Sequence, residues 1–206
     1  MNDIAVKQFH EVMKVKDESS LLPHISYNEY QSLLNEIENN EYRHYLNKKL
    51  IPYLKDCDKL LMEFMWELGG SISDIIGLKT GDIDFGKKII TLVVKKRHWF
   101  INNIPVSDSL LLDISNFMRK YSTIGKFFNF TMQRAWEIVK GYGNKIGMSL
   151  HPHMFRHGLA IYLLQHGVSD KIIARRLGHS SATTTIKYYM VITPEIERDA
   201  LKGILL

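Results

Sequence analysis

The feature that most constrains the fold is a long apolar pattern between Leu50 and Leu68. Its apolar side chains recur every three or four residues, which places them along one side of an α-helix. These side chains are Leu54, Leu60, Leu61, Phe64, Met65 and Leu68. Gly69 and Gly70 follow and predict the end of this helix, because glycine readily adopts the left-handed conformation that closes helices. We therefore expect a core that is mainly helical.

Helical spacing recurs in several other segments. Ser26 followed by Glu29 matches the capping box, in which each side chain bonds the other residue's backbone, so we expect the compact domain to begin there. A short helix is expected from Ser73 to Leu78. Further helices are expected over residues 109–121, 131–142, 155–165, 170–178 after a capping Ser169, 183–190, and in a short form from Pro194.

Residues 88–106 have a different pattern. The run Ile-Ile-Thr-Leu-Val-Val is rich in β-branched residues, and a second strand-like run ends at Val106 after the polar turn Lys95–His98. Such runs favour extended strands. They predict a β-hairpin, or two strands of a small antiparallel sheet. The expected fold class is thus mainly α with a small antiparallel β-sheet (α+β).

Length and composition limit the organisation of the chain. The 206 residues suffice for one core, or for one core with a short appendage. We expect the polar residues 1–22 to be an N-terminal arm or linker and residues 23–206 to form the compact domain. The single cysteine, Cys57, excludes an internal disulfide framework, and no apolar run reaches the roughly 18 residues needed to span a membrane. Without a secretory signal either, the chain is expected to be cytoplasmic.

The most informative chemistry lies in the segment His151–His157. Residues three apart project from the same side of a helix, so His153 and Arg156 can converge on one phosphate oxyanion. The alternative is a helix start with surface histidines. The formal net charge of +5 is compatible with a polyanionic partner. Downstream come Leu177-Gly178-His179 and, nine residues after His179, Tyr188.

This combination, HPHMFRH followed by LGHSSATTTIKYY, resembles the second motif of the tyrosine recombinases, the family of phage integrases and Xer-type recombinases. The resemblance implies that His153, Arg156 and His179 contact the scissile phosphate and that Tyr188 is the nucleophile. Tyr189 is the alternative nucleophile, although it fits a core aromatic better. His153 would accept the phenolic proton. No metal or other cofactor is needed, because the cationic side chains neutralise the developing charge.

The first motif of the family, G-x-R-x-S-E-L, aligns with residues 69–75. Ser73 and Asp74 fit, but Ser71 occupies the position of the first catalytic arginine. A hydroxyl does not bridge phosphate oxygens as a guanidinium does, and losing one such donor typically costs on the order of 3 kcal/mol. Three explanations remain open: an engineered inactivating substitution, which we favour because the other site positions are filled, a natural relative that binds without cutting, or rescue by another basic group.

The family also places a lysine on the β-hairpin as general acid toward the leaving 5′ hydroxyl. Lys96 is preferred slightly over Lys95, and with Arg97 these lysines would otherwise be contacts to the DNA backbone. Arg175 and Arg176, in the helix before Leu177, are two more candidate phosphate contacts. The alternative for both arginines is an exposed helix face.

The resemblance covers residues 24–192 and implies a site-specific recombinase that cleaves and rejoins duplex DNA at a specific recombination site through a 3′-phosphotyrosyl intermediate. It also implies a homotetramer on DNA and a monomer or dimer without it. The tail of residues 192–206 either packs on a neighbouring protomer or folds back on its own. Because 22 residues cannot form the family's N-terminal core-binding domain, we expect either a catalytic fragment or a compact member similar to the fimbrial-switch inverting recombinases.

Other functions remain open at this point. The Leu-Gly-His-Ser-Ser stretch from Leu177 favours a recombinase over a type IB topoisomerase, which shares the chemistry. A non-catalytic DNA-binding accessory protein with the same fold would have Ser71 as its natural residue. A helical protein unrelated to DNA would show no salt-dependent DNA affinity.

Overall fold

The computed structural model describes residues 22–41, 47–94 and 100–178. Within these ranges the chain forms seven α-helices and one three-stranded antiparallel sheet, which confirms the predicted fold class. The helices expected over residues 183–190 and from Pro194, the N-terminal arm and the tail from residue 192 lie outside the described residues, Leu22 at the end of the arm excepted. No helix in the described ranges is long and apolar enough to cross a membrane.

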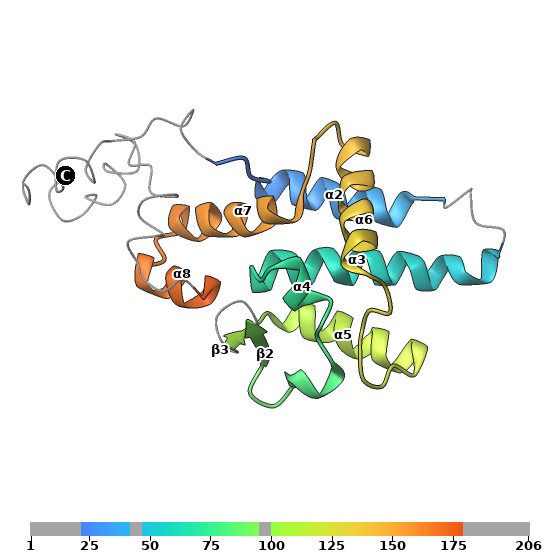
Figure 1. Ribbon diagram of the computed structural model, residues 1–206, viewed down its shortest axis with the longest axis horizontal. Helices are drawn as coiled ribbons and strands as arrows, with labels where there is room; N and C mark the ends of the chain where they lie inside the picture. Colours follow the sequence, from blue (N-terminus) through green and yellow to red (C-terminus); the bar gives the residue numbers. More distant parts are fainter. Residues whose placement is uncertain (1–21, 42–46, 95–99, 179–206) are drawn as a thin grey trace, which may run out of the picture.

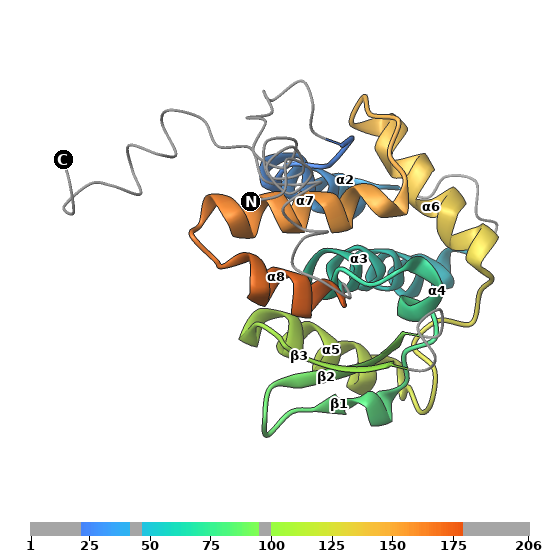
Figure 2. The ribbon, with the colours of Figure 1, turned by 60° about the vertical axis from the view of Figure 1, so that its left-hand side comes forward.

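Helix α3 (Ile51–Leu68), preceded by the 3-10 turn η2 (Lys48–Leu50), lies at the centre of the fold. Figures 1 and 2 show it between α2 (Tyr27–Asn39) and α7 (Pro152–Gln165) on one side and α5 (Asp108–Tyr121) on the other. Its buried residues are Cys57, Asp58, Leu60, Leu61, Met62, Glu63, Phe64, Met65, Trp66 and Leu68. A helix covered on several sides is typical of a core element rather than of a surface helix.

Local signals in the sequence set most helix ends. The capping box is present, with the backbone N–H of Ser26 donating to the Glu29 carboxylate at 2.7 Å. Gly69 ends α3 with a φ of 58°, as predicted. Ser107 caps α5, and Thr131 caps α6 (Met132–Lys145).

Some predicted helix boundaries were wrong. Helix α4 (Ile72–Ile75) is shorter than predicted, and α7 begins at Pro152, three residues early, since a proline in the first turn lacks only an N–H that would have no partner there. Ser169 precedes α8 (Asp170–Leu177) but makes no side-chain cap bond.

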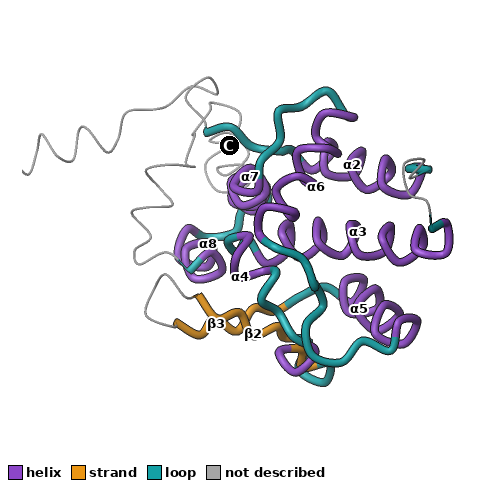
Figure 3. The backbone as a smooth tube through the Cα atoms, turned by 45° about the vertical axis from the view of Figure 1, so that its right-hand side comes forward, coloured by secondary structure: helices purple, strands orange, loops and turns teal. Residues whose placement is uncertain are grey.

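The sheet is a hairpin with one short additional strand (Figure 3). β2 (Ile89–Val94) pairs antiparallel with β3 (Phe100–Pro105), as the sequence predicted, with Ile90 opposite Ile104. β1 (Ile83–Asp84) pairs with the other edge of β2 and was not predicted, because two residues are too few to show an alternating pattern. A 3-10 turn, η3 (Thr80–Asp82), precedes β1.

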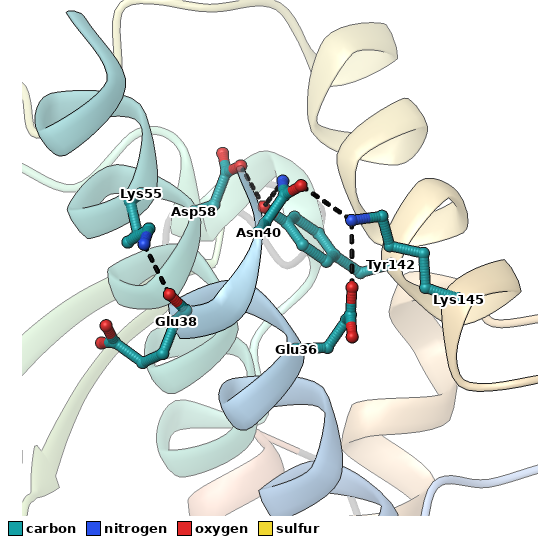
Figure 4. A network of polar contacts seen from close by, with 7 residues as sticks. All are labelled: Glu36, Glu38, Asn40, Lys55, Asp58, Tyr142 and Lys145. Atoms are coloured by element: carbon teal, nitrogen blue, oxygen red, sulfur yellow. Dashed lines mark hydrogen bonds and ion pairs between the residues drawn. The ribbon is translucent and has the colours of Figure 1, made fainter. Parts of the chain in front are cut away.

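A polar network joins α2, α3 and α6 (Figure 4). The hydroxyl of Tyr142 donates to the buried carboxylate of Asp58 at 3.1 Å and accepts from the amide of Asn40 at 3.0 Å. Lys145 donates to the side chain of Asn40 at 2.8 Å and to Glu36 at 3.0 Å. These bonds offset the cost of burying Asp58, because buried polar groups are stable when they have partners.

A second buried acid in α3, Glu63, has fewer hydrogen bonds to offset the cost of its burial. The residue is 8% exposed, and Oε2 has no hydrogen-bond partner within the part of the chain that the structure describes. Lys59 lies 3.6 Å from the other oxygen. Burial, helped by the nearby carboxylate of Asp113, outweighs Lys59 and raises the pKa of Glu63 to about 8. Glu63 therefore holds its proton at neutral pH.

We predict that Glu63 makes the stability of this chain fall as the pH rises. Between about pH 4.5 and 8 the folded chain keeps a proton that the unfolded chain has released, so this group lowers the free energy of unfolding by up to about 1.4 kcal/mol per pH unit. Glu63→Gln removes the titration. Urea denaturation measures the free energy of unfolding of the Glu63→Gln variant and of the parent chain. The value for the variant minus that for the parent should increase by at least about 2 kcal/mol from about pH 5 to about pH 8.5. An equal difference at both pH values would contradict the assignment.

Candidate active site

The C-terminal end of α3 is the point where α7 and α8 meet the rest of the fold. Arg156 of α7 donates through Nη1 to the carbonyl of Gly69 at 2.7 Å. Arg176 of α8 donates to the carbonyl of Glu67 through Nε at 3.0 Å and through Nη2 at 2.7 Å. Carbonyls at a helix C-terminus lack partners within the helix and carry partial negative charge. Two guanidinium groups therefore satisfy this end of α3 and hold three helices together.

The bond from Arg156 brings the two sequence motifs together. Gly69 begins the first motif and lies two residues before Ser71, whereas Arg156 belongs to the second motif, which is more than 80 residues away in the sequence. The fold thus places these two segments next to each other.

Ser71 is bound within its own turn at the start of α4. Its hydroxyl donates to the Asp74 carboxylate at 2.5 Å and lies 2.9 Å from the Ser73 hydroxyl. Asp74 is buried. The Ser71 side chain therefore points to the Asp74 carboxylate in its own turn.

Three histidines lie around the first turns of α7. His153 is exposed, and its ring centre lies 6.4 Å from that of His157, one turn further along the helix. His151 precedes the helix and stacks on Trp136 of α6, with 6.1 Å between ring centres. His153 and Arg156 are one turn apart on the same helix, as their spacing predicted.

The adjacent arginines of α8 have different surroundings. Arg175 is exposed. Arg176 is half-buried, and besides Glu67 it binds the carbonyl of Pro105 at the end of β3, at 3.1 Å. Burial lowers the pKa of Arg176. Its three bonds give Arg176 a structural role that the sequence did not predict, because neighbouring helix positions point about 100° apart and only packing decides which one turns inward.

Asn102 is a structural position beside the candidate site that sequence reasoning missed. It is 4% exposed on β3, and its amide donates to the carbonyls of Arg175 at 3.1 Å and Arg176 at 2.9 Å. A polar residue two positions before the buried Ile104 falls on the inward face of the strand, which is the signal that could have identified it. Through Asn102 the hairpin is fixed to the end of α8.

The remaining predicted site residues lie outside the described part of the chain. They are Lys95, Lys96 and Arg97 in the hairpin turn, and His179, Tyr188 and Tyr189 after α8. The structure does place the chain on both sides of the hairpin turn and on the N-terminal side of the second segment. Val94 and Phe100 flank the hairpin turn, and Gly178 ends α8 with a φ of 66°, directly before His179. The roles of these six residues stay predictions.

Comparison with known sequences identifies the family. Residues 24–194 match the model of the phage integrase family. The chain is 30% identical over 159 residues to the tyrosine recombinase XerA of Pyrococcus furiosus, covering 72% of this chain and 55% of that protein. It is 31% identical over 158 residues to XerD of Bifidobacterium longum, covering 67% of this chain and 50% of that protein. The chain thus spans about half the length of the curated relatives it matches.

Solved structures show the same fold. A crystal structure of XerA recombinase superposes with a TM-score of 0.70 at 17% identity, covering 93% of this chain and 66% of that one. XerH bound to its difH substrate, before cleavage, gives 0.70 at 16% identity, covering 98% of this chain and 64% of that one. The catalytic domain of bacteriophage HP1 integrase gives 0.61 at 19% identity, covering 89% of this chain and 96% of that domain. This chain therefore belongs to the phage integrase family and has the catalytic-domain fold of the tyrosine recombinases.

Proposed function

We propose that this chain binds duplex DNA at a recombination site and is built to cleave and rejoin its strands through a 3′-phosphotyrosyl link to Tyr188. The observation that carries the proposal is the bond from Arg156 to Gly69, which joins the two motifs at the end of α3. Helix α8 ends beside it, so the chain leaves Gly178 toward His179 from the same region. The family relationship and the likeness to a recombinase solved on its DNA substrate support the proposal.

The proposed reaction needs only side chains of this protein and the DNA. The Tyr188 oxygen attacks the phosphorus, forming the phosphotyrosyl bond, while the bond from phosphorus to the 5′ oxygen breaks. His153 takes the phenolic proton, and Lys96 supplies a proton to the leaving 5′ oxygen. Arg156 and His179 stabilise the negative charge that grows on the phosphate oxygens. Attack by a 5′ hydroxyl on the phosphotyrosyl bond reverses these steps and rejoins a strand.

Ser71 sets the level of activity that we propose for this exact sequence. Its hydroxyl is bound to Asp74 and Ser73, so it does not take the place of a guanidinium that bridges two phosphate oxygens. We propose that the chain binds DNA but cleaves it at least about a hundredfold more slowly than a relative with arginine there. The second candidate function is a DNA-binding accessory protein without cleavage. It is favoured by the same two contacts, because they keep the Ser71 hydroxyl bound within its own turn.

Restoring the arginine tests the proposed chemistry. We expect Ser71→Arg to form a covalent adduct at least about a hundredfold faster than the parent chain, because the missing charge on the phosphate is restored. The substrates are nicked suicide duplexes selected from a random pool by their affinity for the chain, and denaturing gels detect the adduct. In the Ser71→Arg background, Tyr188→Phe should abolish the adduct, whereas Tyr189→Phe should retain it. DNA binding without any adduct in Ser71→Arg would favour the accessory protein.

Arg175 and Arg176 provide a matched pair that separates DNA contact from folding. We propose Arg175, with Lys95 and Arg97, as contacts to DNA phosphates, whereas contact between Arg176 and DNA stays an untested prediction. Arg175→Met should weaken DNA binding and reduce the slope of log K against log salt by about 1, with stability within about 0.5 kcal/mol of the parent. Arg176→Met should instead lower the free energy of unfolding by about 2 kcal/mol, because it leaves the part-buried carbonyl of Glu67 without its two donors.

Salt titrations by fluorescence anisotropy and urea denaturation measure the two effects. Equal stability losses in the two variants would contradict the structural role of Arg176. An unchanged salt slope in Arg175→Met would remove Arg175 from the proposed DNA contacts.

A further inference from the structure

His157 belongs to the second motif but has no part in the proposed chemistry. Its Nδ1 lies 2.9 Å from the carbonyl oxygen of Pro23, a residue far away in the sequence. A carbonyl oxygen only accepts hydrogen bonds, so Nδ1 carries the proton and donates. Burial lowers the pKa of His157, and the nearby His153, His151 and Arg156 lower it further, whereas the bond to Pro23 opposes them. The ring is therefore a neutral donor at pH 7.

The segment before α2, residues 22–26, lies directly on the turn of α7 that contains His157. The backbone N–H of Ile25 donates to the carbonyl of Met154 at 3.3 Å, and the Ile25 side chain is fully buried. A Cβ atom on Gly158 would come within 2.0 Å of the Ile25 carbonyl oxygen, so only glycine allows this approach. Pro23 and Ile25 thus hold α7 at three successive points, Met154, His157 and Gly158.

The same turn carries the groups proposed to hold the phosphate. Arg156 lies between Met154 and His157, and its Nη1 binds the Gly69 carbonyl of α3. His153 precedes Met154, and its ring faces that of His157. The segment before α2 therefore contacts the same turn of backbone from which His153 and Arg156 project.

We propose that His157 is a positioning residue, whose bond to Pro23 fixes the turn of α7 so that the segment before α2 sets the orientation of His153 and Arg156 toward the phosphate. This inference rests on the proposed function. A displacement of about 1 Å in such groups is enough to slow a reaction on the order of a hundredfold without changing what touches the substrate. His157 thereby makes the rate of cleavage depend on the chain that leads into the domain.

The test compares two substitutions of His157 in the full chain carrying Ser71→Arg. His157→Leu removes the donor and keeps a similar volume, whereas His157→Asn keeps an N–H at the place of Nδ1. His166→Leu is the matched control, because His166 lies at the other end of α7 and also bonds a main-chain carbonyl, that of Tyr162, at 2.7 Å. Adduct formation on the selected suicide duplexes and DNA affinity are measured for each.

We expect His157→Leu to form the adduct on the order of 10- to 100-fold more slowly, with DNA affinity within about threefold of the parent. His157→Asn should recover most of the rate, and His166→Leu should match the parent. A role in stability alone predicts no change in the rate of the folded protein. The proposal is overturned if His157→Leu is as fast as the parent, if the Asn variant is as slow as the Leu variant, or if His166→Leu is equally slow.

Hydrogen exchange provides a readout that does not depend on activity. In the chain that keeps Ser71, His157→Leu should increase amide exchange in residues 24–25 and in residues 153–158 together, while His157→Asn leaves both segments protected. The inference is overturned if exchange in residues 24–25 increases while exchange in α7 stays unchanged. If Ser71→Arg neither binds DNA nor forms an adduct, the proposed function fails, and the exchange data still decide whether His157 holds α7. If His157→Leu does not fold, the test uses His157→Asn and His166→Leu. Both variants must match the parent in cleavage rate and in amide exchange. A slow His157→Asn variant overturns the inference.

Discussion

The structure depends on two guanidinium groups that bind the carbonyls at the end of α3. Helix α3 is the central core helix, and its last turn would otherwise present backbone acceptors that lack helical partners. Arg156 binds Gly69, and Arg176 binds Glu67, so α7 and α8 are fixed to the same helix end. The partial negative charge of a helix C-terminus stabilises the cations there. A site for an anionic phosphate can then form where positive groups are already held in place.

The hairpin is connected to this arrangement by a buried amide and by one of the two arginines. Asn102 on β3 donates to two carbonyls of α8, and Arg176 returns a bond to Pro105 at the end of the same strand. These bonds cross between segments more than 70 residues apart in the sequence. They fix β3, the strand that follows the hairpin turn, to the end of α8. Lys96 lies between β2 and β3 in the sequence, and His179 follows α8.

The chemistry that we propose depends on the charge at the candidate site. Transfer of a phosphoryl group without a metal relies on several cations acting together, each of which neutralises part of the developing charge. Ser71 contributes a hydroxyl that is bound to Asp74, a buried carboxylate. Affinity for DNA is less sensitive to that loss, because it sums many contacts over the backbone. On the proposed function, Ser71 therefore affects cleavage more than DNA binding.

The sequence by itself determined the local structure and the family. Helix ends at Ser26 and Gly69 were predictable because capping and left-handed turns depend on neighbouring residues, and so was the one-turn spacing of His153 and Arg156. Only the tertiary structure decided that Arg176 turns inward while Arg175 stays exposed, that Asn102 joins the hairpin to α8, and that Pro23 lies on His157. These contacts depend on which surfaces meet in space, and residues distant in the sequence carry no local pattern that reveals their partners.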